Sequence, residues 1–263
     1  MRLLALDTAT DCCSVALWHD GAVLCREARA ERGHGGHVLA LVDELLAEAG
    51  VSLGALDAIA FGRGPGAFTG VRLAASVTQG LAYAAGLPVI PVSDLQAVAQ
   101  RTLARQAAAP HAAVLHAAVP HATAAPAFAR VLVCHDARMG EVYWAGFDAA
   151  EGHARAATAE AVARPAPLIE AALAWLDAVA GGPQGGSGAC GAGTGFAVHA
   201  ELAAGLVPRL EPVWPDLTPH AREIAVLAAH EGLGRAVPPD QAQPVYIRND
   251  VAIIPAPAAP LLS

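Results

Sequence analysis

The sequence predicts an α/β protein built from two similar halves, each a mixed sheet flanked by helices. In both halves an apolar strand ends at an aspartate and is followed by a turn and a second strand. These segments are "LLALDTATDCCSVALW" around Asp7 and "RVLVCHDARMGEVYW" around Asp136. Each half also has a glycine-rich loop, "GRGPGAFTG" at 62–70 and "GACGAGTG" at 188–195. Such strands, alternating with amphipathic helices, are typical of α/β folds.

The first thirty residues predict short strands in succession, because the turn signals "TD" and "DG" separate aliphatic runs there. A helix is expected at 37–49, where the apolar residues fall on one face and Gly50 ends the pattern. A buried strand at 58–61 leads into the first glycine loop, and a second helix is expected at about 70–85. The strand "LPVIPV" and a third helix, capped by Ser93, complete this half.

Changes in composition predict the domain organisation. We expect a first domain at 1–105, an Ala/Pro/His-rich linker or insertion at 106–129, a second domain at 130–235 and a proline-rich tail at 236–263. Within the second domain, residues 165–180 and 219–232 are expected to be helical.

The histidines of the insertion raise the question of a metal site. His111, His116 and His121 recur every five residues, and on a helix each would be rotated by about 140° from the one before. They cannot share one face, so the pattern favours a solvated segment.

The charge composition excludes several functions. The chain has a net charge of −8, and a broad nucleic-acid-binding face needs clustered cations. All 16 basic residues are arginine. Without lysine there is no Walker phosphate loop, no Schiff base and no amine general base.

The cysteines and the apolar segments indicate a cytoplasmic protein. The five cysteines are odd in number and show no Cys-x-x-Cys spacing, which favours free thiols over disulfides or a zinc site. The apolar run before Asp7 has only four residues, "LLAL", which is too short for a signal peptide. The longest charge-free stretch, at 106–129, is too weakly apolar to cross a membrane.

Several segments, in this order, resemble the TsaB (YeaZ) family of tRNA threonylcarbamoyladenosine biosynthesis proteins. They are "LALDTATDCCSVALW", "HGGHVLALVDELLAEAGV", "DAIAFGRGPGAFTGVRLAASVTQGLA", "GLPVIPVSDLQAVA", "DARMGEVYWAGF" and "PVYIRND". The resemblance covers nearly the whole chain, except for roughly 105–130 and the residues after about 250. It implies two duplicated ribonuclease-H-like domains of the actin-like ATPase superfamily.

The resemblance also implies a noncatalytic role. Such chains pair with and activate a homologous catalytic subunit, TsaD, which modifies the adenosine next to the anticodon of tRNA. A TsaE-like ATPase completes the assembly, and tRNA is met only through the complex. Catalytic relatives carry two metal-binding histidines where this chain has Asp94 and Val98. Valine cannot ligate a metal, so we assign no catalytic residue, no metal site and no required cofactor.

A vestigial nucleotide site is nevertheless a second expectation from the resemblance. Weak binding of ATP or ADP with magnesium would involve five residues: Asp7, Thr8, Asp136, Gly191 and Gly193. The alternative is structural, with aspartates capping their turns and glycines packing a turn onto a sheet.

The helices at 37–49 and 70–85 are expected to form a four-helix contact with the catalytic partner, or a self-dimer in its absence. The expected contact residues are His34, Val38, Leu41, Leu45, Gly70, Arg72, Ala74, Ala75 and Thr78. Small side chains let helices approach closely, although one face of each helix must pack on its own sheet.

Two other functions stay open from the sequence. One is a free-standing ATPase or small-molecule kinase of the same superfamily, which would need an intact cleft and a catalytic carboxylate beyond Asp7. The other is a metalloprotease-like protein, against which the missing histidine pair argues.

Overall fold

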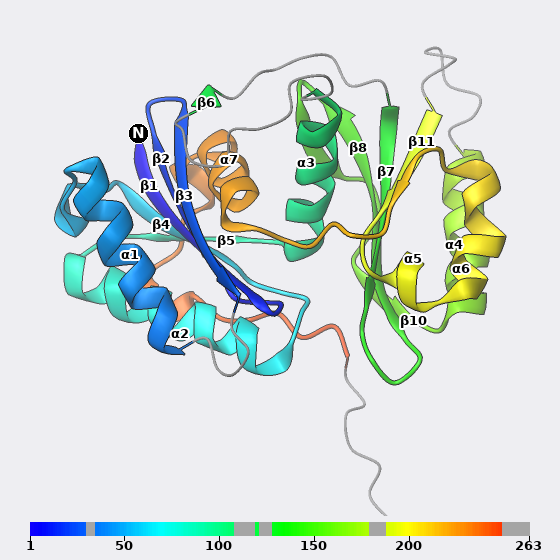
Figure 1. Ribbon diagram of the computed structural model, residues 1–263, viewed down its shortest axis with the longest axis horizontal. Coiled ribbons are helices and arrows are strands. Elements are labelled where there is room, and N and C mark those ends of the chain that lie inside the picture. The colour runs from blue at the N-terminus through cyan, green and yellow to red at the C-terminus, as the bar shows by residue number, and fades with distance from the viewer. Residues whose placement is uncertain (30–34, 108–118, 121–127, 179–187, 249–263) are drawn as a thin grey trace, which may run out of the picture.

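The computed structural model describes residues 1–29, 35–107, 119–120, 128–178 and 188–248. These residues form two mixed sheets with helices on their faces (Figure 1). The first sheet has the order β5-β4-β1-β2-β3-β6. Its strands are β1 (Arg2–Asp7), β2 (Cys12–His19), β3 (Ala22–Arg29), β4 (Ala58–Gly62), β5 (Val89–Val92) and β6 (Val119–Pro120).

The second sheet has the order β10-β8-β7-β11-β12, and β9 pairs with β8. Its strands are β7 (Phe128–Asp136), β8 (Val142–Ala150), β9 (His153–Ala156), β10 (Ala161–Ala163), β11 (Gly188–Ala192) and β12 (Val213–Trp214).

The two sheets repeat one pairing pattern around their aspartate hairpins. Strand β1 is antiparallel to β2 and parallel to β4. In the same way, β7 is antiparallel to β8 and parallel to β11. The predicted duplicated α/β architecture is therefore confirmed.

The helices begin and end close to the predicted positions. They are α1 (Gly35–Ala49), α2 (Phe68–Ala85), α3 (Asp94–Ala107), α4 (Pro165–Ala178), α5 (Gly195–Val198), α6 (Ala200–Leu206) and α7 (Ala221–Glu231). Short 3-10 turns are η1 (Leu53–Ala55), η2 (Val207–Arg209), η3 (Leu233–Arg235) and η4 (Pro239–Gln241). Ser93 caps α3 as expected, because its Oγ accepts a hydrogen bond from Gln96 N at 3.1 Å.

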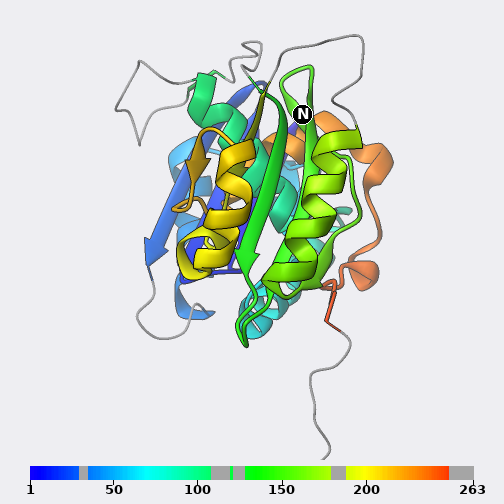
Figure 2. The ribbon, with the colours of Figure 1, turned by 90° about the vertical axis from the view of Figure 1, so that its right-hand side faces the viewer.

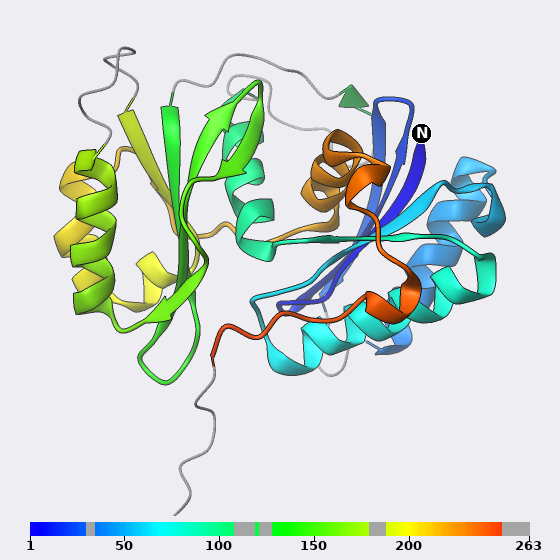
Figure 3. The same cartoon turned by 180° about the vertical axis from the view of Figure 1, so that it is seen from behind.

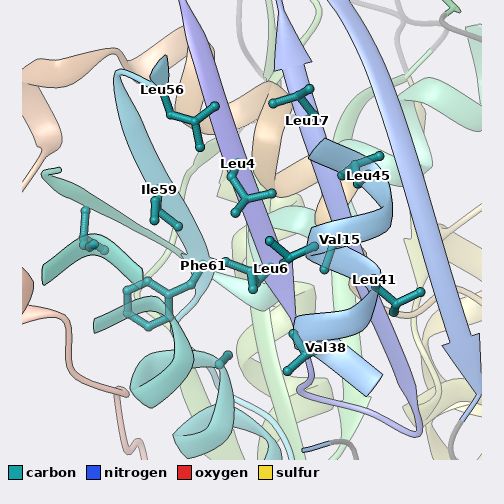
Figure 4. Packing of buried hydrophobic residues seen from close by; sticks show 14 of the residues in the cluster. Leu4, Leu6, Val15, Leu17, Val38, Leu41, Leu45, Leu56, Ile59 and Phe61 are labelled. Carbon is teal, nitrogen blue, oxygen red and sulfur yellow. The ribbon is translucent and has the colours of Figure 1, made fainter. Parts of the chain in front are cut away.

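The first sheet has an apolar core on each face, because successive side chains of a strand point to opposite sides. Leu4 and Leu6 of β1 pack with α1 and α2 in one core (Figure 4). Leu3 and Ala5 pack on the other side, against α7. Helix α3 covers the inner face of the second sheet, and α4 and α6 cover its outer face (Figure 2).

The packing departs from the predicted division into consecutive domains. Helix α7 was expected in the second domain but completes the core of the first sheet. Helix α3 was expected in the first domain, yet Leu95, Val98 and Leu103 pack under the second sheet. The expected insertion at 106–129 contributes β6, which pairs with β3. Each sheet is therefore covered on one face by a helix that the sequence had assigned to the other domain: α7 covers the first sheet and α3 the second.

The start of the predicted tail also belongs to the folded body. Ala242–Arg248, called here the C-terminal segment, follows α2 toward the turn between β7 and β8 (Figure 3). Gln79 Nε2 donates to Ala242 O at 2.9 Å, and Val245 N donates to Arg63 O at 2.7 Å. At the far end, Arg248 Nη2 donates to Ala137 O at 3.0 Å. The segment thus connects α2 with the second sheet.

Candidate functional site

The first glycine loop is filled by the chain's own β1–β2 turn. A Cβ atom on Gly70 would overlap the carbonyl oxygen of Thr8, and one on Gly66 would lie 2.7 Å from the Cβ of Ala9. Thr8 Oγ1 donates to Gly70 O at 2.7 Å, and Ala67 N donates to Ala9 O at 2.8 Å. These glycines allow the start of α2 to lie directly on the turn. In this arrangement the loop packs against protein, and Thr8 is buried beneath it.

Two buried carboxyl groups meet beside this loop. Asp7 ends β1, and its Oδ1 accepts from Ala9 N at 2.8 Å. Asp94 begins α3, and its Oδ2 accepts from Gly64 N at 2.5 Å. Both carboxyl groups adjoin Gly62, where any Cβ would overlap Asp94 Oδ1 and lie 3.2 Å from Asp7 Oδ1. Among the described groups, Asp7 Oδ2 and Asp94 Oδ1 have no hydrogen-bond partner.

The surroundings of this acid pair favour its protonated form. Burial raises the pKa of Asp7 to about 6, although the amide of Ala9 and the charge of His220 act in the opposite direction. Burial, together with the neighbouring Asp7 carboxylate, raises the pKa of Asp94 well above its usual range. The sequence placed Asp94 at a lost metal-ligand position but gave no sign that it lies next to Asp7.

Asp136 lies in a separate polar cluster of the second sheet. Its Oδ1 accepts from Arg138 N at 3.2 Å and lies 3.2 Å from His199 Nε2. Asp7 and Asp136 each accept the amide two residues ahead, so the turn-capping alternative is confirmed for both. Asp7 therefore adjoins Asp94, whereas Asp136 pairs with His199 and Arg138. Magnesium binding by Asp7 and Asp136 stays a prediction.

The second glycine loop is also packed against protein. A Cβ on Gly193 would overlap Cys134 O, and one on Gly191 would lie 3.0 Å from both Phe196 Cζ and Val213 Cγ2. The neighbouring Thr194 Oγ1 accepts from Asp136 N at 3.1 Å. Close packing therefore accounts for Gly191 and Gly193. Nucleotide binding at these positions stays a prediction.

The expected contact residues of α1 and α2 are corrected by their burial. Val38, Leu41, Leu45, Gly70, Ala74, Ala75 and Thr78 are all buried in the isolated chain. Apart from Gly70 and Thr78, they belong to the core on the first sheet (Figure 4). Apolar periodicity identified the face that covers the sheet, so these side chains offer no surface to a partner. Arg72 is exposed, and His34 lies outside the described residues.

The exposed side of α2 has a different composition, which the sequence analysis missed. We define the α2 outer face as Thr69, Arg72, Ser76, Gly80 and Tyr83, which recur every three or four residues and are exposed. Tyr83 is 84% exposed, and the adjoining Phe68 is 56% exposed. The exposed side of α1 includes Leu39, Asp43 and Glu44. The sequence does indicate these exposed sides, because their residues occupy the positions between the apolar ones that cover the sheet.

Comparison with known proteins identifies the family. The tRNA threonylcarbamoyladenosine biosynthesis protein TsaB of Escherichia coli K12 is 38% identical over 260 residues, which is 96% of each chain. The chain belongs to the TsaB family. A solved structure described as YeaZ from Pseudomonas aeruginosa is 40% identical, with a TM-score of 0.71 over 93% of this chain and 99% of that one. A second, described as an uncharacterized protein with similarity to peptidase YEAZ from the same organism, is 39% identical, with a TM-score of 0.71 over 94% and 99%.

The α1–α2 region of this TsaB chain also resembles a second family. Residues 28–118 match the family model described as TsaD, tRNA N6-adenosine threonylcarbamoyltransferase. This range contains α1, α2 and α3. Within the described part of this TsaB chain, three or more His, Cys, Asp or Glu residues nowhere gather as a metal site would require. No helix in that part is both long and apolar enough to span a membrane.

Proposed function

We propose that this chain is the noncatalytic partner subunit of a tRNA threonylcarbamoyl transferase complex. It pairs with and activates a TsaD-like catalytic subunit, which forms threonylcarbamoyladenosine next to the anticodon of tRNA. The observation that carries the proposal is the 38% identity to the Escherichia coli TsaB protein across 96% of both chains. In this proposal a TsaE-like ATPase completes the complex, tRNA is met through the complex, and this chain needs no cofactor of its own.

The packing beside the first glycine loop supports a role without chemistry. Asp7 and Thr8 are buried beneath the loop, and Asp94 holds the loop through Gly64. Val98 is part of the core under the second sheet. These groups are enclosed by the chain's own backbone and core, whereas a reacting group must reach its substrate.

The partner surface in this proposal consists of the α2 outer face and the exposed side of α1. The TsaD family model covers both helices, so the catalytic subunit has a corresponding pair. Like surfaces of related chains can meet about a pseudo-twofold axis. Ser76 and Gly80 allow close approach at the centre of α2, and Phe68 and Tyr83 supply exposed aromatic area near its ends. Without the catalytic subunit, the same surface can pair two copies of this chain.

Ser76→Arg tests this surface, because a large charged side chain would separate the helices where they approach most closely. We expect binding of the organism's TsaD homologue, measured by titration calorimetry, to weaken by at least about tenfold, which corresponds to roughly 1.4 kcal/mol. The melting temperature should be unchanged, since Ser76 is exposed. Ala171→Arg, at an exposed position of α4, is the matched control and should bind like the parent.

Two results would overturn different parts of this proposal. If the parent chain does not bind the TsaD homologue, the partner-subunit role is wrong. If the parent binds and Ser76→Arg binds equally well, the role stands and the interface lies elsewhere.

A further inference from the structure

Three consecutive residues of the β7–β8 turn have a left-handed backbone. The φ angle is 63° at Arg138, 56° at Met139 and 75° at Gly140. Glycine adopts such angles readily, whereas the side chains of the other two residues make this conformation costly. Met139 is also 76% exposed, so little packing of its side chain offsets that cost. A strained turn of this kind persists only where other parts of the structure hold it.

Arg248 of the C-terminal segment holds this turn. Its Nη2 group donates to the carbonyl oxygens of Ala137 at 3.0 Å and Arg138 at 3.4 Å. Its Nη1 group donates to the sulfur of Met139 at 3.6 Å, and its Nη2 lies 2.5 Å from Glu141 Oε2. One arginine thus contacts the start, the middle and the end of the turn. The motifs "DARMGEVYWAGF" and "PVYIRND", which lie far apart in the sequence, meet at this contact.

The same segment is attached to the first half of the molecule. Besides the hydrogen bonds of Ala242 and Val245 described above, the hydroxyl of Tyr246 accepts from Arg72 Nε at 2.6 Å. The ring of Tyr246 lies 6.0 Å, centre to centre, from that of Phe68. The segment is therefore one short connection, with one end on α2 and the other on the β7–β8 turn (Figure 3).

The attachment of this segment has costs as well as contacts. Arg248 Nε is buried and has no hydrogen-bond partner among the described groups. A charged donor in that position loses hydration without compensation, and the left-handed turn adds its strain. Apart from Ala242, each residue of the segment is at least partly exposed. Because few buried apolar contacts hold it, such a segment opens more readily than the core.

We propose that the C-terminal segment is a latch that joins the two halves of the molecule. In the closed latch, Arg248 stabilises the left-handed turn, and the turn supplies the carbonyl oxygens and the carboxylate that hold Arg248. When Arg248 leaves, the turn relaxes and Val245 and Tyr246 lose their support, so both ends open as one unit. The latch goes beyond the proposed function, because it is a property of this chain alone.

Amide hydrogen exchange of the full chain, measured residue by residue by NMR, tests the latch. The reporting amides are those of Ala137, Glu141 and Val245, which donate to Glu141 O, Arg138 O and Arg63 O. In the parent these amides should share one opening equilibrium and exchange faster than the amides of β1. Arg248→Met keeps much of the side-chain stem and removes its hydrogen bonds and ion pair. All three amides should then exchange about tenfold faster, while those of β1 stay unchanged.

A second variant acts from the opposite end of the latch. The described contacts of Tyr246 are with α2, so Tyr246→Ala should speed exchange at Ala137 and Glu141 only if the two ends are coupled. A third variant, Arg138→Gly, relieves strain, because glycine adopts the left-handed angle freely. It should slow exchange at the turn and make the turn less sensitive to Arg248→Met.

Arg209→Met is the matched control, because it breaks the ion pair of an exposed arginine of η2 with Asp177 and should leave every reporting amide unchanged. The latch is overturned if Arg248→Met leaves exchange at Val245 as in the parent. It is equally overturned if Tyr246→Ala leaves the amides of the turn unchanged, since the ends would then move independently. If Arg248→Met speeds exchange in β1 as much as in the turn, the segment is an integral part of the core and the proposal is wrong.

Discussion

At the scale of single residues, Asp7 and Asp94 form the least expected feature of the first sheet. Each uses one carboxyl oxygen to fix backbone, Asp7 at the β1–β2 turn and Asp94 at the glycine loop. Their other oxygens are buried without a described partner. Two carboxylates in such a place repel each other and lack hydration, so the ionised pair opposes folding.

The sign of the pH effect follows from the direction of the shift. The pKa of Asp7 rises from 3.8 to about 6 on folding, so between these values the folded state binds more protons than the unfolded state. The favourable contribution of the protonated form is complete below the unfolded pKa of 3.8 and is lost as the pH rises from there through about 6. Asp94, shifted in the same direction, extends this loss to higher pH.

Asp7→Asn should therefore stabilise the protein more at pH 7.5 than at pH 5. Its side-chain oxygen can still accept from Ala9 N, while the repulsion with Asp94 is removed. We expect a gain of about 2 to 3 kcal/mol at pH 7.5, measured by urea unfolding at both pH values. Asp136→Asn is the control, because Asp136 caps the equivalent turn beside His199 and Arg138, and should show no such gain. A larger loss of stability at pH 7.5 than at pH 5 for Asp7→Asn would contradict the prediction.

Sequence reasoning anticipated only part of this residue-level structure. The turn-capping alternative for Asp7 and Asp136 could be derived, because an aspartate after a strand commonly accepts the amide two residues ahead. The contact between Asp7 and Asp94 could not, since it depends on how β1, β4 and the start of α3 meet at Gly62. No local pattern relates two acids that lie 87 positions apart.

At the scale of elements, α2 requires glycine at one position and merely tolerates it at another. Gly70 faces the carbonyl of Thr8 without room for a Cβ atom, whereas Gly80 has no heavy atom within 4 Å of the place a Cβ would take. The two glycines lie in the same helix and differ in what surrounds them.

Gly70→Ala should destabilise the chain severely, because α2 would have to move away from the β1–β2 turn and break the Thr8–Gly70 hydrogen bond. Gly80→Ala should stabilise it by about 0.5 to 1 kcal/mol, the usual effect of removing a glycine from the interior of a helix. Thermal unfolding of the isolated chain measures both, and each variant is the control for the other. Equal stabilities would show that the close packing at Gly70 is absent.

Periodicity predicted where α1 and α2 lie but misidentified the side that meets a partner. A period of 3.6 residues shows which side of a helix is apolar, and in both helices that side covers the first sheet. Ala74→Arg would accordingly disrupt the core rather than test an interface, because Ala74 is completely buried. Of the expected contact residues on α2, Arg72 is the exposed one, and its hydrogen bond to Tyr246, 174 residues further along the chain, could not be read from local periodicity.

At the scale of the whole molecule, the buried position of Asp7 and Thr8 leads to a prediction about activity. We expect the purified chain to hydrolyse ATP no faster than a control preparation and to bind ATP with magnesium weakly or not at all. Nucleotide contact with these residues would require the glycine loop to leave the β1–β2 turn. Hydrolysis assays and titration calorimetry check this. Robust turnover that disappears in Asp7→Ala, or submicromolar affinity, would favour the free-standing ATPase.

The duplicated architecture could be predicted from the sequence, whereas the exchange of helices between the sheets could not. Each half repeats its own strand and turn signals, so the existence of two sheets follows from local patterns. The apolar sides of α3 and α7 show that both are covered, but give no indication of which sheet covers them. That choice depends on contacts between segments far apart in the chain.

The exchange has a consequence for how the protein is made. One face of the first sheet, including Leu3 and Ala5, is covered by α7, which spans Ala221–Glu231. A growing chain has all the long strands of that sheet once Val92 has been added, but lacks its covering helix until well over a hundred further residues follow. Because translation adds about 5 to 20 residues per second, this apolar face stays uncovered for on the order of ten seconds. Ribosome stalling within that window should therefore give a nascent chain that needs a chaperone, and a fragment ending near residue 105 should aggregate.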